Sequence, residues 1–379
     1  MQLNTLGLKN FRNINEAYLQ FSDNLNIFIG DNGQGKTNII EAIHFLIEGE
    51  SFRYGDNSTI IQFGYESAFV RTKLMNNNLD YQISLKISSQ RKEILVNEKK
   101  MATHLNPLPP IVLFSPESLS VIKESADERR KLIDQLISSI SKNGKALTTD
   151  FKKALKTRNR LLKDISEGKT HIGIGIQTLE SLDEIYFKLA AQLTCQRIKH
   201  LTNIKPYIQD SLSKIESLNQ KIDYDFTYFI SDQKIVENFE ENHFNLMKKR
   251  SLELRQVELN SGISLVGPQK HDVIFLYNGN DSRFYCSQGQ QRSIILAFKI
   301  AQIVYHHEVN GFYPVLLLDD VLSELDQNKQ SSLVKTLNQI QTQTFLTSTN
   351  IGVLKQFSLS LDTAKNSVFK VKNGAITSE

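Results

Sequence analysis

Residues 30–37 are a glycine-rich segment that ends in lysine and threonine, and they constrain the fold more than any other segment. A mostly apolar run, residues 25–29, precedes them, and residues 38–47 carry apolar side chains at helical spacing. Strand, loop and helix in this order form a P-loop, where backbone N–H groups and the helix N-terminus face phosphates. The expected nucleotide ligands are Gly30, Asp31, Asn32, Gly33, Gln34, Gly35, Lys36 and Thr37.

Two of these residues have specific chemistry. Lys36 can reach the β and γ phosphates as a point charge, and the Thr37 hydroxyl can join the shell of a bound Mg²⁺. An ordinary glycine-rich turn is the alternative. The full eight-residue match between the correct flanking elements argues against it, so ATP and Mg²⁺ are the predicted ligands.

A second phosphate-related segment ends in two aspartates. Residues 316–318 are apolar and follow Pro314, which predicts a strand buried on both faces with Asp319 at its carboxyl end. Asp319 can hold the metal together with Thr37, and Asp320 projects to the other side, where it could orient or deprotonate a water molecule. The alternative is a buried strand that ends in two solvated acids.

Residues 287–291, Ser-Gln-Gly-Gln-Gln, open a third segment, in which apolar residues recur with helical period from Ile294 to Val304. Backbone N–H groups at a helix N-terminus attract anions. Taken alone, a plain capped helix is at least as good an interpretation. The position shortly before the Asp319 strand favours a nucleotide-related role.

The order of predicted elements divides the chain into three parts. Short strands dominate up to residues 111–114, helical periodicity continues from Glu117 past Leu201 with an interruption at Pro206, and strands and helices then return. We therefore predict an α/β fold with an inserted helical lobe: residues 1–115 and 263–379 form the P-loop core, and residues 116–262 form the lobe. A hairpin is expected around residues 278–281, with residues 273–277 and 283–285 as its arms.

Composition excludes several classes of protein. No apolar stretch approaches the roughly 20 residues that cross a bilayer, so the expectation is a cytoplasmic protein without a membrane partner. Cys195 and Cys286 are the only cysteines, and their sequence contexts do not indicate a disulfide, a zinc site or a thiol nucleophile. The net charge of +4, from 45 basic and 41 acidic residues, does not by itself indicate nucleic acid.

The distribution of charge is more informative than the total. Residues 142–165 predict a basic amphipathic helix, in which only Asp150 and Asp164 oppose the cations. A DNA-contacting face and an ordinary solvated face explain this pattern equally well. Residues 248–255 are a weaker second candidate. The cations of the first segment are Lys145, Lys152, Lys153, Lys156, Arg158, Arg160 and Lys163.

These motifs together resemble the ABC-type ATPases of chromosome maintenance, the SMC and RecF group, with the RecF family as the closer match. The phrases that carry the resemblance are residues 9–13, 30–37, 114–117 with 127–134, 287–292 and 316–326. It implies an ABC/SMC-type P-loop ATPase head. In such proteins the signature of one protomer completes the P-loop site of another, so Ser287, Gly289 and Gln290 would touch nucleotide only in an ATP-dependent homodimer.

The resemblance also implies roles for single residues. Arg12 is similar to the family arginine that reaches the nucleotide phosphates, although a lone exposed arginine is the simpler interpretation of that position. Glu324 resembles part of the D-loop at the dimer interface, where it or Asp320 could place water. Candidates for the Q-loop, Gln62, and for the switch residue, Ser348 or Thr349, rest on sequence order alone.

Two departures from the family pattern qualify these expectations. Transporter-type ATPases usually have glutamate after the metal-binding aspartate, whereas Asp320 is one methylene shorter, which favours slow hydrolysis and agrees with the RecF pattern. The phrase at residues 267–272 normally carries histidine, arginine and two aspartates after the proline. Only Asp272 stands in place here, so the function of this turn is open.

The resemblance predicts an ATP-dependent DNA-binding protein of recombinational repair and replication, active in the DNA-damage (SOS) response. It would be a weak ATPase with Lys36, Asp319, Asp320 and Glu324 as catalytic residues, and would recruit other recombination mediators to single-stranded and duplex DNA and to gap junctions. The alternatives are a nucleotide-binding scaffold without useful turnover and an ABC-type mechanical ATPase of another class, such as a transporter subunit. Transporter ATPases are shorter and lack the phrases at residues 114–117 and 127–134.

Overall fold

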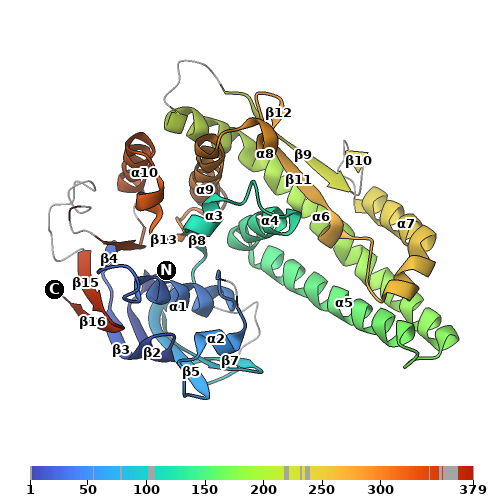
Figure 1. The fold of residues 1–379 in the computed structure, drawn as a ribbon, viewed down its shortest axis with the longest axis horizontal. Helices are drawn as coiled ribbons and strands as arrows, with labels where there is room; N and C mark the ends of the chain where they lie inside the picture. The colour runs from blue at the N-terminus through green and yellow to red at the C-terminus, as the bar shows by residue number, and fades with distance from the viewer. Residues whose placement is uncertain are drawn as a thin grey trace. The chain divides into compact units, whose positions relative to one another are not determined.

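The chain forms two compact units (Figure 1). The first unit comprises Met1–Leu119, Lys214–Ser217 and Leu296–Glu379, and the second comprises Ser120–Ser213 and Leu218–Ile295. The computed structural model describes residues 2–53, 55–76, 79–100, 107–216, 222–230, 233–234, 240–340, 342–349, 352 and 366–378.

The boundary of the second unit differs from the prediction. Residues 263–295 were expected in the P-loop core, but they belong to the second unit. The reason is strand pairing, because β11 (Asp272–Tyr277) lies antiparallel to β9 (Tyr224–Ile230) along its whole length. Helix α9 (Gln288–Asn310) therefore begins in the second unit and continues in the first.

The first unit contains a mainly parallel sheet in the order β16-β15-β4-β14-β13-β8. Every residue of β8, β13 and β14 is buried, and β8 and β13 are the continuous apolar runs that are typical of parallel sheets. Since β4, β13 and β14 are parallel neighbours, the residues that follow them lie at one edge of the sheet. The strands are β4 (Leu25–Ile29), β8 (Ile111–Phe114), β13 (Val315–Leu318), β14 (Thr344–Ser348), β15 (Asn366–Lys372) and β16 (Ala375–Ser378).

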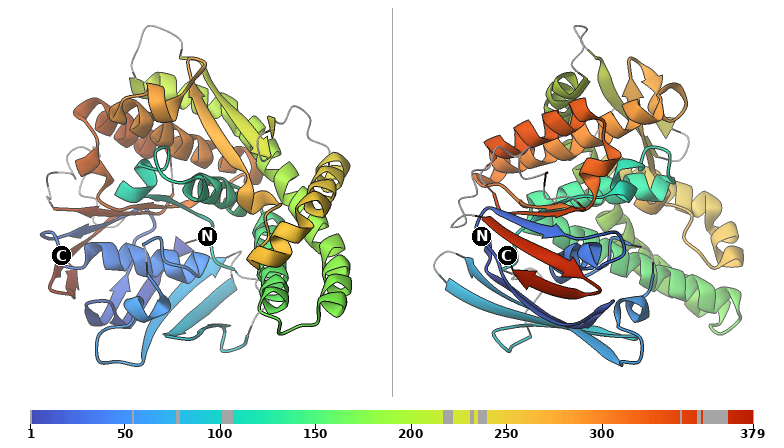
Figure 2. Two further views of the ribbon diagram at one scale, coloured as in Figure 1. Left: turned by 45° about the vertical axis from the view of Figure 1, so that its right-hand side comes forward. Right: turned by 60° about the vertical axis from the view of Figure 1, so that its left-hand side comes forward.

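A second, antiparallel sheet has the order β3-β2-β5-β6-β7, with β1 paired to β5. Helix α1 (Lys36–Glu48) lies between this sheet and the parallel one (Figure 2), and its buried Ile39, Ile40 and Ile43 belong to a core that receives side chains from both sheets. The strands are β1 (Gln2–Leu3), β2 (Thr5–Phe11), β3 (Ile14–Gln20), β5 (Ser67–Asn76), β6 (Leu79–Ser88) and β7 (Lys92–Val96). The remaining helices of the unit are α2 (Asn57–Ile60), α3 (Pro116–Leu119), η3 (Val321–Glu324) and α10 (Gln327–Gln339).

Long helices dominate the second unit. They are α4 (Ala126–Ile140), α5 (Lys142–Ser166), α6 (Ile172–Glu216) and α7 (Glu240–Ser261), beside a small sheet in the order β10-β9-β11-β12. The predicted interruption at Pro206 is wrong, because this residue lies inside α6, which is continuous over its 45 residues. In the part of the chain that the structure describes, no helix is long and apolar enough to cross a membrane.

The predicted hairpin is right in its first arm and wrong in its second. After β11 the chain makes a short strand, β12 (Asn280–Asp281), and then a helical turn, α8 (Ser282–Tyr285). The Asp281 side chain accepts a hydrogen bond from the Arg283 backbone N–H at 2.9 Å and so caps this turn. The cap explains why residues that favour strands locally are helical here.

Helix α5 is the predicted basic helix, with one correction. Arg158 is buried and cannot form part of a solvent-facing cationic surface. Its guanidinium donates to Asp183 at 2.8 Å, to Glu258 at 2.7 Å and to the Ser264 hydroxyl at 2.8 Å, which satisfies the buried charge. The exposed cations of the helix are Lys142, Lys152, Lys153, Lys156, Arg160 and Lys163.

Candidate nucleotide and metal site

The loop of residues 30–37 has the backbone geometry that a phosphate cradle needs. Gly33 has φ +78° and Gly35 has φ +113°, in the region that favours glycine. A Cβ atom at Gly30 would lie 2.3 Å from the Val371 carbonyl oxygen, so the close approach of β15 also requires glycine. Gly35 is the N-cap of α1, and the N-terminus of this helix begins inside the loop.

The other end of the chain holds this loop in place. The Gln34 carbonyl accepts a hydrogen bond from the Gly374 N–H at 2.9 Å, and the Gln34 side-chain oxygen accepts one from the Asn373 N–H at 2.6 Å. The Asn13 amide donates to the Gln34 carbonyl at 3.2 Å. Sequence reasoning missed Asn373 and Gly374, because nothing in a turn between two antiparallel strands indicates contact with a loop 340 residues away.

Lys36 lies over the loop with its charge already oriented. Its Nζ donates to the carbonyl oxygens of Gly30 at 2.6 Å and Asp31 at 2.8 Å. Burial lowers the pKa of Lys36, and the nearby carboxylates of Asp320, Asp319 and Asp31 oppose that shift. Asp31 and Asn32 are exposed, so the loop keeps a face open to a ligand.

Asp319 meets Thr37 at the carboxyl end of β13. The Thr37 hydroxyl donates to Asp319 Oδ1 at 2.9 Å, and the Thr347 hydroxyl donates to the same oxygen at 3.0 Å. Burial raises the pKa of Asp319 to about 6, and these two hydrogen bonds oppose the shift. The predicted pair is therefore brought together across 282 residues of sequence.

The donor set at this point fits Mg²⁺. The ion takes oxygen ligands and usually keeps water and phosphate oxygens in its shell, so one hydroxyl and one carboxylate are a typical protein contribution. Asp319 is 3% exposed, and among the described residues no lysine or arginine forms an ion pair with it. A divalent cation would supply the positive charge that this buried carboxylate lacks.

Asp320 has a strained backbone, and the Thr347 hydroxyl, which also contacts Asp319, binds its N–H group. Its φ is +49°, a conformation that non-glycine residues seldom adopt, and its N–H donates to the Thr347 hydroxyl at 2.8 Å. Thr347 thus touches both aspartates. The sequence-based candidates for the switch residue, Ser348 and Thr349, are its neighbours, and Ser348 contributes its carbonyl to the Gly30 N–H at 3.3 Å.

We expect Thr347→Val to slow ATP hydrolysis about tenfold, because one hydrogen bond to a charged group is worth about 1.5–3 kcal/mol. In the wild-type protein the Thr347 hydroxyl lowers the pKa of Asp319. Its removal should therefore raise that pKa and move the acid limb of the pH–rate profile to higher pH. Steady-state phosphate release between pH 5 and 9 measures both effects. Thr344→Val, at the opposite end of β14, is the matched control. An unchanged pH profile in the Thr347 variant would contradict this role.

Arg12 is engaged within the protein. Its guanidinium forms a two-point contact with the buried Glu41, at 2.9 and 2.6 Å, and donates to the Thr59 carbonyl at 2.7 Å. The predicted contact with nucleotide phosphate therefore requires an exchange of partners and stays a prediction. The same holds for the roles of Glu324, at the end of η3, and of Gln62, whose backbone N–H donates to the Asn10 carbonyl.

The signature residues form a capping box at the start of α9. The Ser287 N–H donates to Gln290 Oε1 at 2.9 Å, and the Gln290 N–H donates to Ser287 Oγ at 3.2 Å. Ser287 is exposed, and Gly289 lies between the two. The helix N-terminus thus presents backbone N–H groups and small polar side chains to solvent, as a lid over phosphates needs. Contact with nucleotide in a second protomer stays a prediction.

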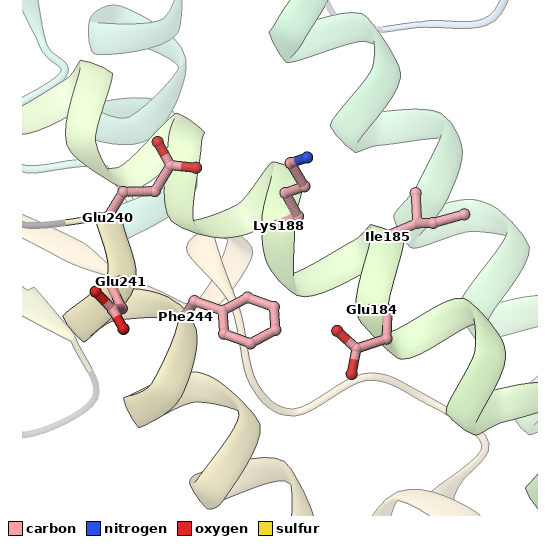
Figure 3. A pocket seen from close by; sticks show the side chains of 6 residues that line it. All are labelled: Glu184, Ile185, Lys188, Glu240, Glu241 and Phe244. Atoms are coloured by element: carbon pink, nitrogen blue, oxygen red, sulfur yellow. The ribbon is translucent and has the colours of Figure 1, made fainter.

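A hollow of about 550 Å³ in the second unit is a poor alternative site for nucleotide (Figure 3). Three of its lining residues, Glu184, Glu240 and Glu241, are acidic and would repel phosphate, against the single cation of Lys188. The Phe244 ring of α7 projects between these acids, toward Glu184 of α6. The P-loop therefore remains the candidate site.

Comparisons with known proteins agree with this geometry. Residues 2–377 match the family model of the RecF/RecN/SMC N-terminal domain. The DNA replication and repair protein RecF of Alkaliphilus oremlandii is 35% identical over 390 residues, covering 99% of this chain and 100% of the relative. The RecF protein of Lactobacillus johnsonii is 32% identical over 365 residues, covering 93% of each chain.

Solved structures give the same result. A structure of the recombination mediator protein RecF-ATPrS in the RecFOR pathway has a TM-score of 0.82 and 31% identity, covering 100% of this chain and 98% of that one. An Smc head domain from Pyrococcus furiosus, 15% identical with a TM-score of 0.54 and covering 100% and 95%, shows the fold alone. The predicted ABC/SMC-type ATPase head is confirmed. The chain belongs to the RecF family of the RecF/RecN/SMC group.

Proposed function

We propose that this chain binds ATP with Mg²⁺ at the P-loop and acts in recombinational DNA repair and replication. Two copies would enclose two ATP molecules, hold DNA in this state, and recruit other repair proteins to gaps. The observation that carries the proposal is the contact of Thr37 with the buried Asp319, beside a lysine already oriented over the glycine-rich loop. The relatives support the pathway, since they are named for DNA replication and repair or for the RecFOR pathway.

Each residue has a defined part in this mechanism. Lys36 and the N-terminus of α1 neutralise phosphate charge, and Thr37 and Asp319 would hold the metal, which supplies further neutralisation of the charge that develops on the phosphates. Asp320, fixed by Thr347, or Glu324 places the attacking water. Ser287, Gly289 and Gln290 of a second copy complete the site, so that bound ATP joins the two copies and slow hydrolysis separates them.

The surface proposed to contact DNA is the exposed cationic face of α5. Lys152, Lys156, Arg160 and Lys163 follow one another at intervals of three or four residues and so lie on one side of the helix. Such a row can follow a phosphate backbone without reading its sequence. Its contribution would be electrostatic and therefore sensitive to salt.

A titration of labelled single-stranded, duplex and gapped DNA at two salt concentrations, with ATP and with ADP, tests this function. We expect tighter, salt-sensitive binding with ATP only. Substituting Lys152, Lys156 and Arg160 together with glutamine should lower the salt slope by about 1 for each residue that contacts a phosphate. The same changes at Lys248, Lys249 and Arg250 of α7 are the control, because Glu184 and Glu253 already pair with two of these cations. Equal weak binding with both nucleotides would contradict the proposal.

A nucleotide-binding scaffold without useful turnover is the second candidate, and the short side chain of Asp320 favours it. Phosphate release measured with and without DNA separates the two. Turnover that depends on Asp319 supports the switch, whereas ATP-dependent DNA binding without any turnover supports the scaffold.

A further inference from the structure

Four charged side chains of the second unit form a continuous chain of ion pairs. The Arg129 guanidinium binds Asp272 through two hydrogen bonds, at 3.0 and 2.8 Å. Arg283 reaches the same Asp272 at 3.5 Å and binds Asp281 through contacts of 2.7 and 3.1 Å. The chain therefore runs from α4 through the start of β11 to α8.

The first member of this ion-pair chain is firmly anchored. Arg129 is 3% exposed, and its remaining donor groups bind the carbonyl oxygens of Glu124 at 2.6 Å and Ile122 at 3.2 Å. The neighbouring Arg130 donates to the His271 carbonyl at 2.6 Å. These contacts link residues 127–134 to residues 267–272. The nucleotide site does not explain either of these two segments.

The last member of the chain lies next to the signature. Asp281 caps α8, and Ser282, the first residue of this turn, is fully buried. Gln291, in the first turn of α9, donates to the carbonyls of Ser282 at 2.8 Å and of Arg283 and Cys286 at 3.3 Å. The backbone that leads into Ser287 is therefore fixed on one side by the ion-pair chain and on the other by the signature helix itself.

We propose that Asp272, Arg283 and Asp281 are positioning residues that hold the segment before Ser287 in the conformation required to bind nucleotide across a dimer. This inference rests on the proposed function. It assigns a role to Asp272, the acid that remains in the 267–272 phrase. Phe284 and Tyr285 are exposed on the same turn at 77% and 74%, so their rings contribute little apolar packing to α8, and the ion pairs act together with the Gln291 hydrogen bonds to hold it.

The contact between Arg283 and Asp281 depends on the charge and shape of both groups. Arg283 is about one quarter exposed and holds Asp281 in a forked geometry that lysine cannot reproduce. Its hydrogen bond to Asp281 raises the pKa of Arg283. Asparagine in place of Asp281 would keep the side-chain volume, and glutamine in place of Arg283 would be uncharged but shorter. Both would lose the charge-assisted bonds, while leaving the P-loop in the other unit untouched.

Arg283→Gln, compared with wild type and with Arg250→Gln, tests the inference in the full-length protein. Arg250 is the control because it also forms an ion pair with a nearby carboxylate, Glu253, but on the exposed surface of α7. Sedimentation velocity with ATP measures self-association, and titration of a fluorescent ATP analogue at low protein concentration measures nucleotide binding by the single chain. We expect self-association to weaken about tenfold or more in Arg283→Gln alone, with nucleotide affinity within about twofold of wild type.

A second variant distinguishes the loss of the ion pair from misfolding of the Arg283 variant. Asp281→Asn keeps a side chain suited to capping α8 and removes only the charge, so it should weaken self-association in the same direction. Arg283→Lys should recover part of the loss. Wild-type association in both uncharged variants, or a parallel loss of nucleotide affinity, would overturn the inference. Failure of the wild-type protein to associate with ATP would instead overturn the proposed function.

Discussion

Replacing Lys36 with alanine is expected to lower ATP affinity about a hundredfold and to abolish ATP-dependent self-association. The ammonium group lies within 2.6 and 2.8 Å of two loop carbonyls, at the point where the loop and α1 would receive the phosphates. Losing two charge-assisted hydrogen bonds to phosphate, each worth about 1.5 kcal/mol at the low end of their usual range, accounts for a change of this size. Alanine supplies neither the charge nor the reach.

Titration with a fluorescent ATP analogue and sedimentation velocity with ATP measure the two effects. Lys335→Ala, on the exposed face of α10, is the matched control and should behave as wild type. Lys36→Arg keeps the charge in a bulkier form and should still lose self-association, because the guanidinium does not fit a loop closed around an ammonium. Dimers that persist in Lys36→Ala with normal nucleotide loading would refute the mechanism.

Asp319→Asn should abolish Mg²⁺-dependent hydrolysis and, in the absence of nucleotide, stabilise the protein. The pKa of Asp319 is about 6 in the folded protein, above its usual value of 3.8. The folded state therefore favours the protonated carboxyl, and the contribution of this group to stability falls as pH rises from about 4 through 6. At pH 8 the ionised carboxylate costs up to about 3 kcal/mol, since one pKa unit corresponds to about 1.4 kcal/mol.

Thermal unfolding at pH 5 and pH 8 tests the stability effect. Asp319→Asn should unfold at a higher temperature than wild type at pH 8, with a smaller difference at pH 5, where the wild-type carboxyl is mostly protonated. Asp23→Asn, at an exposed position of the same unit, should change neither value. Added Mg²⁺ and ATP should stabilise wild type and have little effect on Asp319→Asn. Equal stability of the two proteins at pH 8 would contradict the expected cost of burying the ionised carboxylate of Asp319.

Local sequence patterns predicted the P-loop part of the first unit. Strands β4 and β8 begin and end at the predicted residues, since each is a short, mostly apolar run bounded by turn-forming residues. The contact of Thr37 with Asp319 could also be expected, because parallel strands deliver their carboxyl ends to one edge. Motif chemistry and strand direction are both local properties, which explains this success.

Properties that depend on tertiary contact could not be predicted in this way. Arg158 belongs to a cationic series in the sequence, yet two carboxylates from other helices draw it into the interior. Successive side chains of β14 point to opposite faces of the sheet. Which of them contacts the aspartates, as Thr347 does, depends on how β14 lies beside β13. The boundary at Ile295 depends on the pairing of β11 with β9, whose partners lie more than 40 residues apart.

The support of Gln34 by Asn373 and Gly374 has a consequence for biosynthesis. A ribosome makes the glycine-rich loop more than 300 residues before it makes the turn that braces it. Nascent chains thus carry an unbraced loop until residues 373 and 374 have been made. Tight capture of nucleotide during biosynthesis would therefore wait for this turn.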